Sequence, residues 1–166
     1  MELWDLYDKN RNKLNKVAKR GDYLKDDEFH LVVNAWIINK NGEFLITQRN
    51  EYKSHPLMWE TTGGSVNSGE DSITGALREV KEELGIDLDI SNAKLIGSTT
   101  RYYEGCPDIL DVWLFESNVL LDEITIQKEE VNDVMWASKE KILELFNNKK
   151  FEANAFFMDV INFNQK

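Results

Sequence analysis

The strongest constraint on the fold is a helical pattern at residues 72–84, preceded by Gly63-Gly64 and followed by Gly85. At about 100° per residue, five apolar side chains fall within about 60° of one direction and three glutamates fall opposite. The apolar residues are Ile73, Ala76, Leu77, Val80 and Leu84, and the acids are Glu79, Glu82 and Glu83. Oxygen acceptors at residues 70–72 favour a helix start, and Gly85 favours a stop. The pattern predicts a helix packed on a core by one face.

The acidic face of this helix brings three carboxylates together, because the glutamates are spaced three and four residues apart. Repulsion in one such pair costs about 0.3 kcal/mol in an isolated helix. A bound hard divalent cation such as Mg²⁺ would turn this net repulsion into a net attraction, since it prefers oxygen ligands. The alternative interpretation is a solvated acidic face on a surface helix.

The residues around the glutamates favour an organised site. Arg78 precedes the first glutamate and can donate several hydrogen bonds that hold carboxylates in place. Glu70, eight residues earlier, can orient Arg78. Gly63 and Gly64 allow backbone atoms to approach an ion or a phosphate closely.

Composition limits the class of protein. A chain of 166 residues with 42% hydrophobic residues is long and apolar enough for one compact domain with a real core. A net charge of −10 argues against a nucleic-acid polymer as partner, because affinity for phosphate backbones comes mainly from Lys and Arg. An anionic small molecule must then be brought in by metal ions or by a local basic cluster.

The cysteine content, the lengths of the apolar runs and the first residues of the chain indicate where the protein is located. Cys106 is the only cysteine, so no internal disulfide can form. No run approaches the roughly 18 apolar residues of a membrane span, and the start lacks the form of a signal peptide. We therefore expect a cytoplasmic protein without a membrane partner.

The remaining pattern predicts a mixed sheet with helices on its faces, in a single domain over residues 1–166. Residues 1–29 form an N-terminal extension with a hairpin at 3–8 and 14–19. Further strands are expected at 30–38, 43–48, 59–62, 94–103, 109–119 and 131–137, and helices at 139–146 and 153–163. A polar loop at 49–58 carries two cations, Arg49 and Lys53.

Residues 64–86 resemble the signature of the Nudix hydrolases, the MutT-like family. That signature is Gly, five residues, Glu, seven residues, Arg-Glu, an aliphatic residue, any residue, Glu-Glu, any residue, Gly and an aliphatic residue. Its specified positions are occupied here by Gly64, Glu70, Arg78, Glu79, Val80, Glu82, Glu83, Gly85 and Ile86.

The resemblance implies an α/β/α sandwich and a Mg²⁺-dependent hydrolase that cleaves the diphosphate bond of a nucleoside diphosphate linked to another moiety. It implies that Glu79, Glu82 and Glu83 bind the metal, with the Gly63 carbonyl as a further ligand and Mn²⁺ as the alternative ion. Arg78, Glu70 and Gly64 then support the site, and a metal-activated water attacks phosphorus.

The identity of the general base stays open at this point. In this family the base is either a glutamate of the signature or an acid outside it. Glu79 is the first candidate, and Glu130, in Glu129-Glu130-Val131, is the second. The alternative for Glu130 is an ordinary charge in a loop.

A finer resemblance links residues 30–59 to the isopentenyl-diphosphate isomerases, which share the fold. By this resemblance Arg49 and Lys53 contact the substrate diphosphate. The catalytic cysteine of those isomerases is replaced here by Gly63, and Cys106 lies far along the chain. This departure argues against the isomerase, and the intact Arg78 and signature glutamates argue against a non-catalytic nucleotide-binding regulatory module, so we favour the hydrolase over both alternatives. The hairpin, with Trp4 and Tyr7, either forms a homodimer contact or closes over its own sheet.

Overall fold

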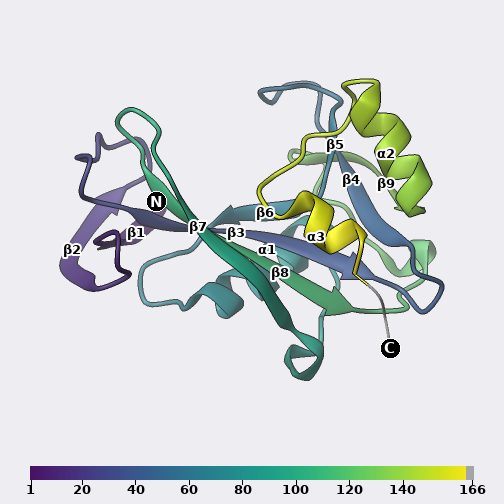
Figure 1. The fold of residues 1–166 in the computed structure, drawn as a ribbon, viewed down its shortest axis with the longest axis horizontal. Helices are drawn as coiled ribbons and strands as arrows, with labels where there is room; N and C mark the ends of the chain where they lie inside the picture. Colours follow the sequence, from purple (N-terminus) through teal and green to yellow (C-terminus); the bar gives the residue numbers. More distant parts are fainter. Residues whose placement is uncertain (164–166) are drawn as a thin grey trace.

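A computed structural model describes residues 1–163 and divides the strands between two sheets. A two-stranded hairpin, β1 (Leu3–Tyr7) and β2 (Lys13–Lys19), lies apart from the large sheet (Figure 1). The large sheet contains β3 (His30–Ile38), β4 (Phe44–Arg49), β5 (Trp59–Glu60), β6 (Thr62–Ser65), β7 (Lys94–Arg101), β8 (Asp108–Glu116) and β9 (Val131–Ala137). The helices are α1 (Ser72–Leu84), α2 (Lys139–Asn147) and α3 (Phe157–Ile161), with 3-10 turns at Ile90–Asn92 and Leu121–Glu123.

The large sheet is mixed, as predicted. Its strands follow the order β5-β4-β3-β8-β7, while β6 also pairs with β3 and β9 with β4. Strand β3 runs parallel to β8 and antiparallel to β4 and β6. β3 is therefore the central strand of the sheet, and it pairs with β6, which contains Gly64, the first residue of the signature.

Alternate side chains of β3 enter two different cores. Trp36 and Ile38 pack with α2 and α3, whereas Val33 and Ile37 pack with α1. Because side chains of a strand alternate between faces, a strand that is apolar on both faces needs cover on both. Figure 1 shows α3 in front of the sheet and α1 behind it. The α/β/α sandwich with an N-terminal hairpin is confirmed.

Helix α1 begins and ends at the predicted residues. The Asp71 side chain accepts a hydrogen bond from the Thr74 amide at 2.9 Å, which caps the first turn. Gly85 ends the helix with a φ of 70°, a conformation that favours glycine. Ala76, Val80 and Leu84 of the apolar stripe are fully buried. The opposite face is thereby fixed toward the outside of the core.

Two predicted elements differ from the structure. The helix expected at 153–163 is limited to Phe157–Ile161, because Phe156, directly before it, has a left-handed φ of 64°. Further upstream, Phe151 forms a bridge with Trp59, and the Glu152 amide bonds to the Trp59 carbonyl at 2.8 Å. The chain before α3 is therefore extended along β5. The strand expected at 59–62 is divided at Thr61, since β5 pairs with β4 whereas β6 pairs with β3. None of the helices in residues 1–163 is long and apolar enough to span a membrane.

The hairpin is anchored to the large sheet by polar contacts. Tyr7 and Phe29 exchange backbone hydrogen bonds of 2.8 and 2.9 Å. In the hairpin turn, the Arg11 guanidinium donates to both carboxylate oxygens of Asp111 on β8, at 2.6 and 2.7 Å. Asp111 is only 1% exposed, so this ion pair holds a buried charge.

We expect Arg11→Ala to lower the free energy of unfolding by about 2 kcal/mol at pH 7, because Asp111 loses its counter-charge. Burial raises the pKa of Asp111, but hydrogen bonds led by that of Arg11 outweigh burial and hold it below its ordinary value. The stabilisation is present above about pH 4 and is lost as pH falls through the folded pKa. Chemical denaturation between pH 3 and pH 7 measures the difference. Lys9→Ala, at an exposed position of the same turn, is the control, and an equal effect of both variants would contradict this account.

Candidate active site

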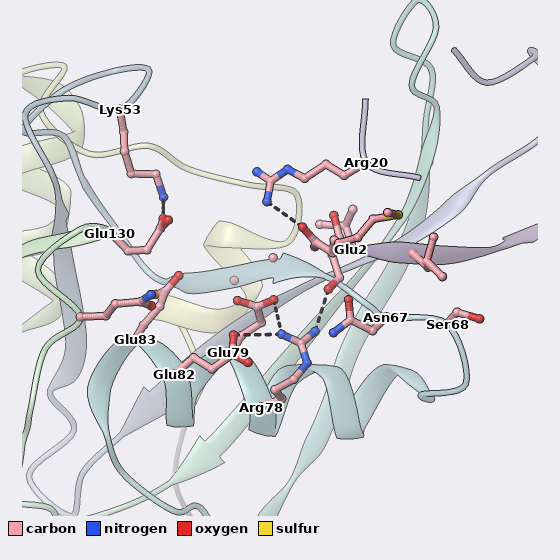
Figure 2. A pocket seen from close by; sticks show the side chains of 17 residues that line it. Glu2, Arg20, Lys53, Asn67, Ser68, Arg78, Glu79, Glu82, Glu83 and Glu130 are labelled. Carbon is pink, nitrogen blue, oxygen red and sulfur yellow. Dashed lines mark hydrogen bonds and ion pairs between the residues drawn. The ribbon is translucent and has the colours of Figure 1, made fainter. Parts of the chain in front are cut away.

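A cavity of about 740 Å³ lies over the acidic face of α1 (Figure 2). Helix α1, strands β3 and β6, the hairpin and three loops contribute its walls. Its carboxylates are those of Glu2, Glu79, Glu82, Glu83 and Glu130, and its cations are Arg20, Lys53 and Arg78. The structure thus brings all three helical glutamates and the predicted Glu130 to one cavity.

Arg78 connects the parts of the signature. Its Nε donates to both oxygens of Glu70 at 2.9 and 3.1 Å, and its Nη2 donates to the Ser65 carbonyl at 2.9 Å. Its Nη1 donates to Glu79 at 2.8 Å and to Glu82 at 3.2 Å. One guanidinium therefore offsets the repulsion between two carboxylates and ties α1 to β6.

Glu83 has a different environment from its two neighbours. It is 9% exposed and makes no ion pair within residues 1–163. Burial, with the negative charges of Glu79 and Glu60, raises the pKa of Glu83 to about 8. Burial likewise raises the pKa of Glu79, against the hydrogen bond from Arg78. Both raised pKa values show that nearby positive charge does not offset the cost of burying these two carboxylates.

Gly63 and Gly64 allow two close approaches in β6. A Cβ atom at Gly64 would lie 2.5 Å from the Glu79 carboxylate, so the side chain of Glu79 rests against the bare backbone. A Cβ at Gly63 would lie 2.4 Å from the Val33 carbonyl of the paired strand β3. Gly64 therefore leaves space for the Glu79 side chain, and Gly63 allows β6 to lie close to β3.

The donor set fits a hard divalent cation. Within residues 1–163 no three acid, histidine or cysteine side chains converge on a single point, and Arg78 holds Glu79 and Glu82 by hydrogen bonds. The chemistry of the cavity still favours such an ion, because its free carboxylate oxygens are hard ligands. The buried and unpaired carboxylate of Glu83 adds a demand for positive charge.

The two predicted substrate cations have different surroundings. Lys53 lines the cavity and forms an ion pair with Glu130. Arg49 does not line the cavity, since its Nη1 donates to both oxygens of Glu60 at 2.9 and 2.8 Å and its Nε to the Ser54 carbonyl at 2.7 Å. Cys106 is also elsewhere, with its sulfur 3.5 Å from the His30 ring.

The sequence did not indicate that the hairpin reaches the cavity. Glu2 and Arg20 line it, together with Asn67, Ser68 and Gln127 from two loops. Arg20 is one of 20 basic residues, and nothing in its neighbours distinguishes it. Arg20 reaches the cavity because β2 pairs with β1 and the hairpin contacts the loop that leads into α1, at Ser68 and Gly69.

The comparison with known proteins agrees with this fold and cavity. The family model of the NUDIX domain matches residues 28–157. The chain belongs to the Nudix hydrolases and is therefore a pyrophosphohydrolase, an enzyme that acts on pyrophosphate bonds of nucleotide derivatives.

Relatives match nearly the whole chain. An uncharacterized Nudix hydrolase of Listeria innocua is 39% identical over 91% of this chain and 88% of its own length. One of Listeria monocytogenes is 37% identical over 98% of this chain and 95% of its own length. A crystal structure of a Deinococcus radiodurans protein has a TM-score of 0.75 at 22% identity, over 96% of this chain and 97% of that chain. The similarity therefore includes the hairpin as well as the family domain.

The two glycines of β6 give a paired prediction. We expect Gly63→Ala to lower the free energy of unfolding by about 2 kcal/mol, because the new Cβ meets backbone that cannot move freely. We expect Gly64→Ala to cost less than about 1 kcal/mol and to displace Glu79, because a side-chain end can give way. Chemical denaturation and a crystal structure of Gly64→Ala measure both effects. Equal destabilisation with Glu79 unmoved would contradict the prediction.

Proposed function

We propose that this protein is a Mg²⁺-dependent hydrolase that cleaves the diphosphate bond of a nucleoside diphosphate linked to another moiety. The observation that carries the proposal is the cavity over α1, which Glu79, Glu82 and Glu83 all line and in which Arg78 holds the first two of these carboxylates. Mn²⁺ is the alternative ion. The substrate is a small molecule, which a cavity of about 740 Å³ can enclose in part.

The residues of the cavity divide the work. Glu79, Glu82 and Glu83, with the Gly63 carbonyl, would hold the metal, and Arg78 keeps two of these carboxylates in orientation. When bound, the metal neutralises the diphosphate and lowers the pKa of a water molecule. Lys53 binds a phosphate oxygen as a point charge. Glu70 and Gly64 act indirectly, the first through Arg78 and the second by leaving room for Glu79.

Two acids remain candidates for the general base. Glu79 is mostly buried and rests beside Gly64, whereas Glu130 is 39% exposed and pairs with Lys53. A phosphate that takes Lys53 would free Glu130 to accept a proton from water. A pH profile of turnover for Glu130→Gln separates the two, because loss of its acidic limb would identify Glu130 as the base and an unchanged profile would favour Glu79.

The isomerase alternative finds no support in the cavity. The position of the catalytic cysteine is Gly63, and Cys106 does not line the cavity. A double-bond shift needs a group that delivers a proton to carbon and another that removes one. The cavity offers carboxylates suited to a metal instead.

The direct test is incubation of the purified protein with Mg²⁺ and a panel of nucleoside triphosphates, nucleotide sugars, dinucleotides and isopentenyl diphosphate. We expect a nucleotide derivative to release a phosphate-bearing product, and chelation to stop the reaction. We expect Glu83→Gln to lower kcat by at least about a hundredfold, because a metal ligand loses its charge. Glu129→Gln, an exposed acid beside Glu130, is the matched control. Isomerised isopentenyl diphosphate with no cleaved nucleotide would refute the proposal.

The two loop cations give a further prediction. We expect Lys53→Gln to raise KM about tenfold with little change in stability, because a charge-assisted contact to phosphate is lost. We expect Arg49→Gln to lower the melting temperature instead, since it leaves Glu60 without its partner. Steady-state kinetics and thermal unfolding of both variants measure the contrast. A rise in KM for Arg49→Gln at unchanged stability would restore its predicted contact with substrate.

A further inference from the structure

The open end of the hairpin forms one wall of the cavity. Glu2 precedes β1 and Arg20 follows β2, and the two residues lie side by side because the Arg20 amide bonds to the Glu2 carbonyl at 3.0 Å. Their side chains form an ion pair of 2.8 Å. Figure 2 shows this pair on one side of the cavity and Lys53 with Glu130 on another, with the acids of α1 between them.

The wall is fastened to the loop that leads into α1. The Ser68 amide donates to the Leu3 carbonyl at 2.7 Å. The Asp5 carboxylate accepts from the Ser68 hydroxyl and from the Gly69 amide, both at 2.8 Å. Asp5 is 6% exposed and also pairs with Lys13 at 2.7 Å. The next residue after this loop segment, Glu70, holds Arg78, so the hairpin has a defined position relative to the metal-binding acids.

The three cations of the cavity differ in what they can offer. Arg78 uses Nε, Nη1 and Nη2 on protein acceptors. Lys53 pairs with Glu130. Within residues 1–163, Arg20 forms its ion pair with Glu2 alone, and its side chain is 73% exposed. A guanidinium carries five N–H donors in a fork that matches phosphate oxygens, so Arg20 retains donors for a ligand.

We propose that Arg20 is a substrate-binding residue of this hydrolase, which binds a phosphate group of the substrate from the hairpin side while Glu2 competes for the same guanidinium. The inference rests on the proposed function and assigns a role to residues 1–27, which lie outside the matched NUDIX domain. The hairpin then completes the active site, and the whole chain acts as one unit. The ligand class is a phosphoanion brought to the acids of α1 by its metal ion.

Competition between Glu2 and substrate predicts effects of opposite sign. Removing the Arg20 charge takes away a contact to phosphate, so binding weakens. Removing the Glu2 charge frees Arg20 and reduces repulsion of an anion, so binding strengthens. A merely structural ion pair at the hairpin end would make both variants weaken binding and stability together.

The experiment compares Arg20→Gln, Glu2→Gln and the control Lys19→Gln, which removes the same charge from an exposed side chain of β2 outside the cavity. Calorimetric titration with inorganic pyrophosphate in Mg²⁺ measures binding, and assay of free phosphate in the same samples detects any turnover. Kinetics with any substrate found in the panel measure KM and kcat, and thermal unfolding measures stability. We expect Arg20→Gln to weaken binding about tenfold and raise KM by a similar factor, Glu2→Gln to strengthen binding at least about twofold, and Lys19→Gln to change it less than about twofold.

The outcomes separate this inference from the proposed function. If nothing in the panel is cleaved but the opposite shifts in pyrophosphate binding appear, the hydrolase proposal fails and the role of Arg20 in anion binding stands. If the wild-type protein is active and Arg20→Gln binds like Lys19→Gln, the role of Arg20 is wrong. Weaker binding in both Arg20→Gln and Glu2→Gln, with lower stability, would also overturn it.

Discussion

The structure depends on the burial of β3 on both faces. This strand sends Trp36 and Ile38 into one core and Val33 and Ile37 into the other, and it pairs with β4, β6 and β8. Helices must cover both faces, and α1 covers the face that carries Val33 and Ile37, where it contacts β3 and β6. The close contact of Gly63 with the Val33 carbonyl then sets how near β6 lies. The position of the acids follows, because the apolar stripe of α1 leaves Glu79, Glu82 and Glu83 no other direction to face.

Much of the candidate site could be predicted because it depends on residues close together in the sequence. The stripe from Ile73 to Leu84, the cap at Asp71 and the stop at Gly85 define the helix, and helical spacing alone brings the acids together. The hydrogen bonds of Arg78 to Glu70 and Glu79 lie within one segment of ten residues, 70–79. The sheet was predictable for the same reason, since short runs rich in Val, Ile and Trp, such as residues 30–38 before the Asn41-Gly42 turn, indicate strands.

The remainder depends on contacts between distant segments. Arg49 and Lys53 are both cations near the same loop, and the sequence does not distinguish their roles. In the structure Arg49 forms an ion pair with Glu60, whereas Lys53 lines the cavity. Arg20 reaches the cavity because contacts between distant segments position the hairpin, among them those of Asp5 with Ser68 and Gly69. Likewise α3 begins only at Phe157, because Phe156, whose ring packs against Gly97 of β7, has a left-handed φ of 64°. Local propensity does not determine which partner a charge or a strand end will meet.

The attachment of the hairpin includes one pair of rings with a spectroscopic consequence. Trp4 of β1 is 4% exposed and stacks on His30 of β3, with ring centroids 4.1 Å apart and planes 12° apart. Burial lowers the pKa of His30 to about 4, so this imidazole is neutral near pH 7. Separation of the hairpin from β3 would expose the indole of Trp4 to water. The emission of Trp4, one of five tryptophans in the chain, therefore reports whether the hairpin is packed on β3, without any added label.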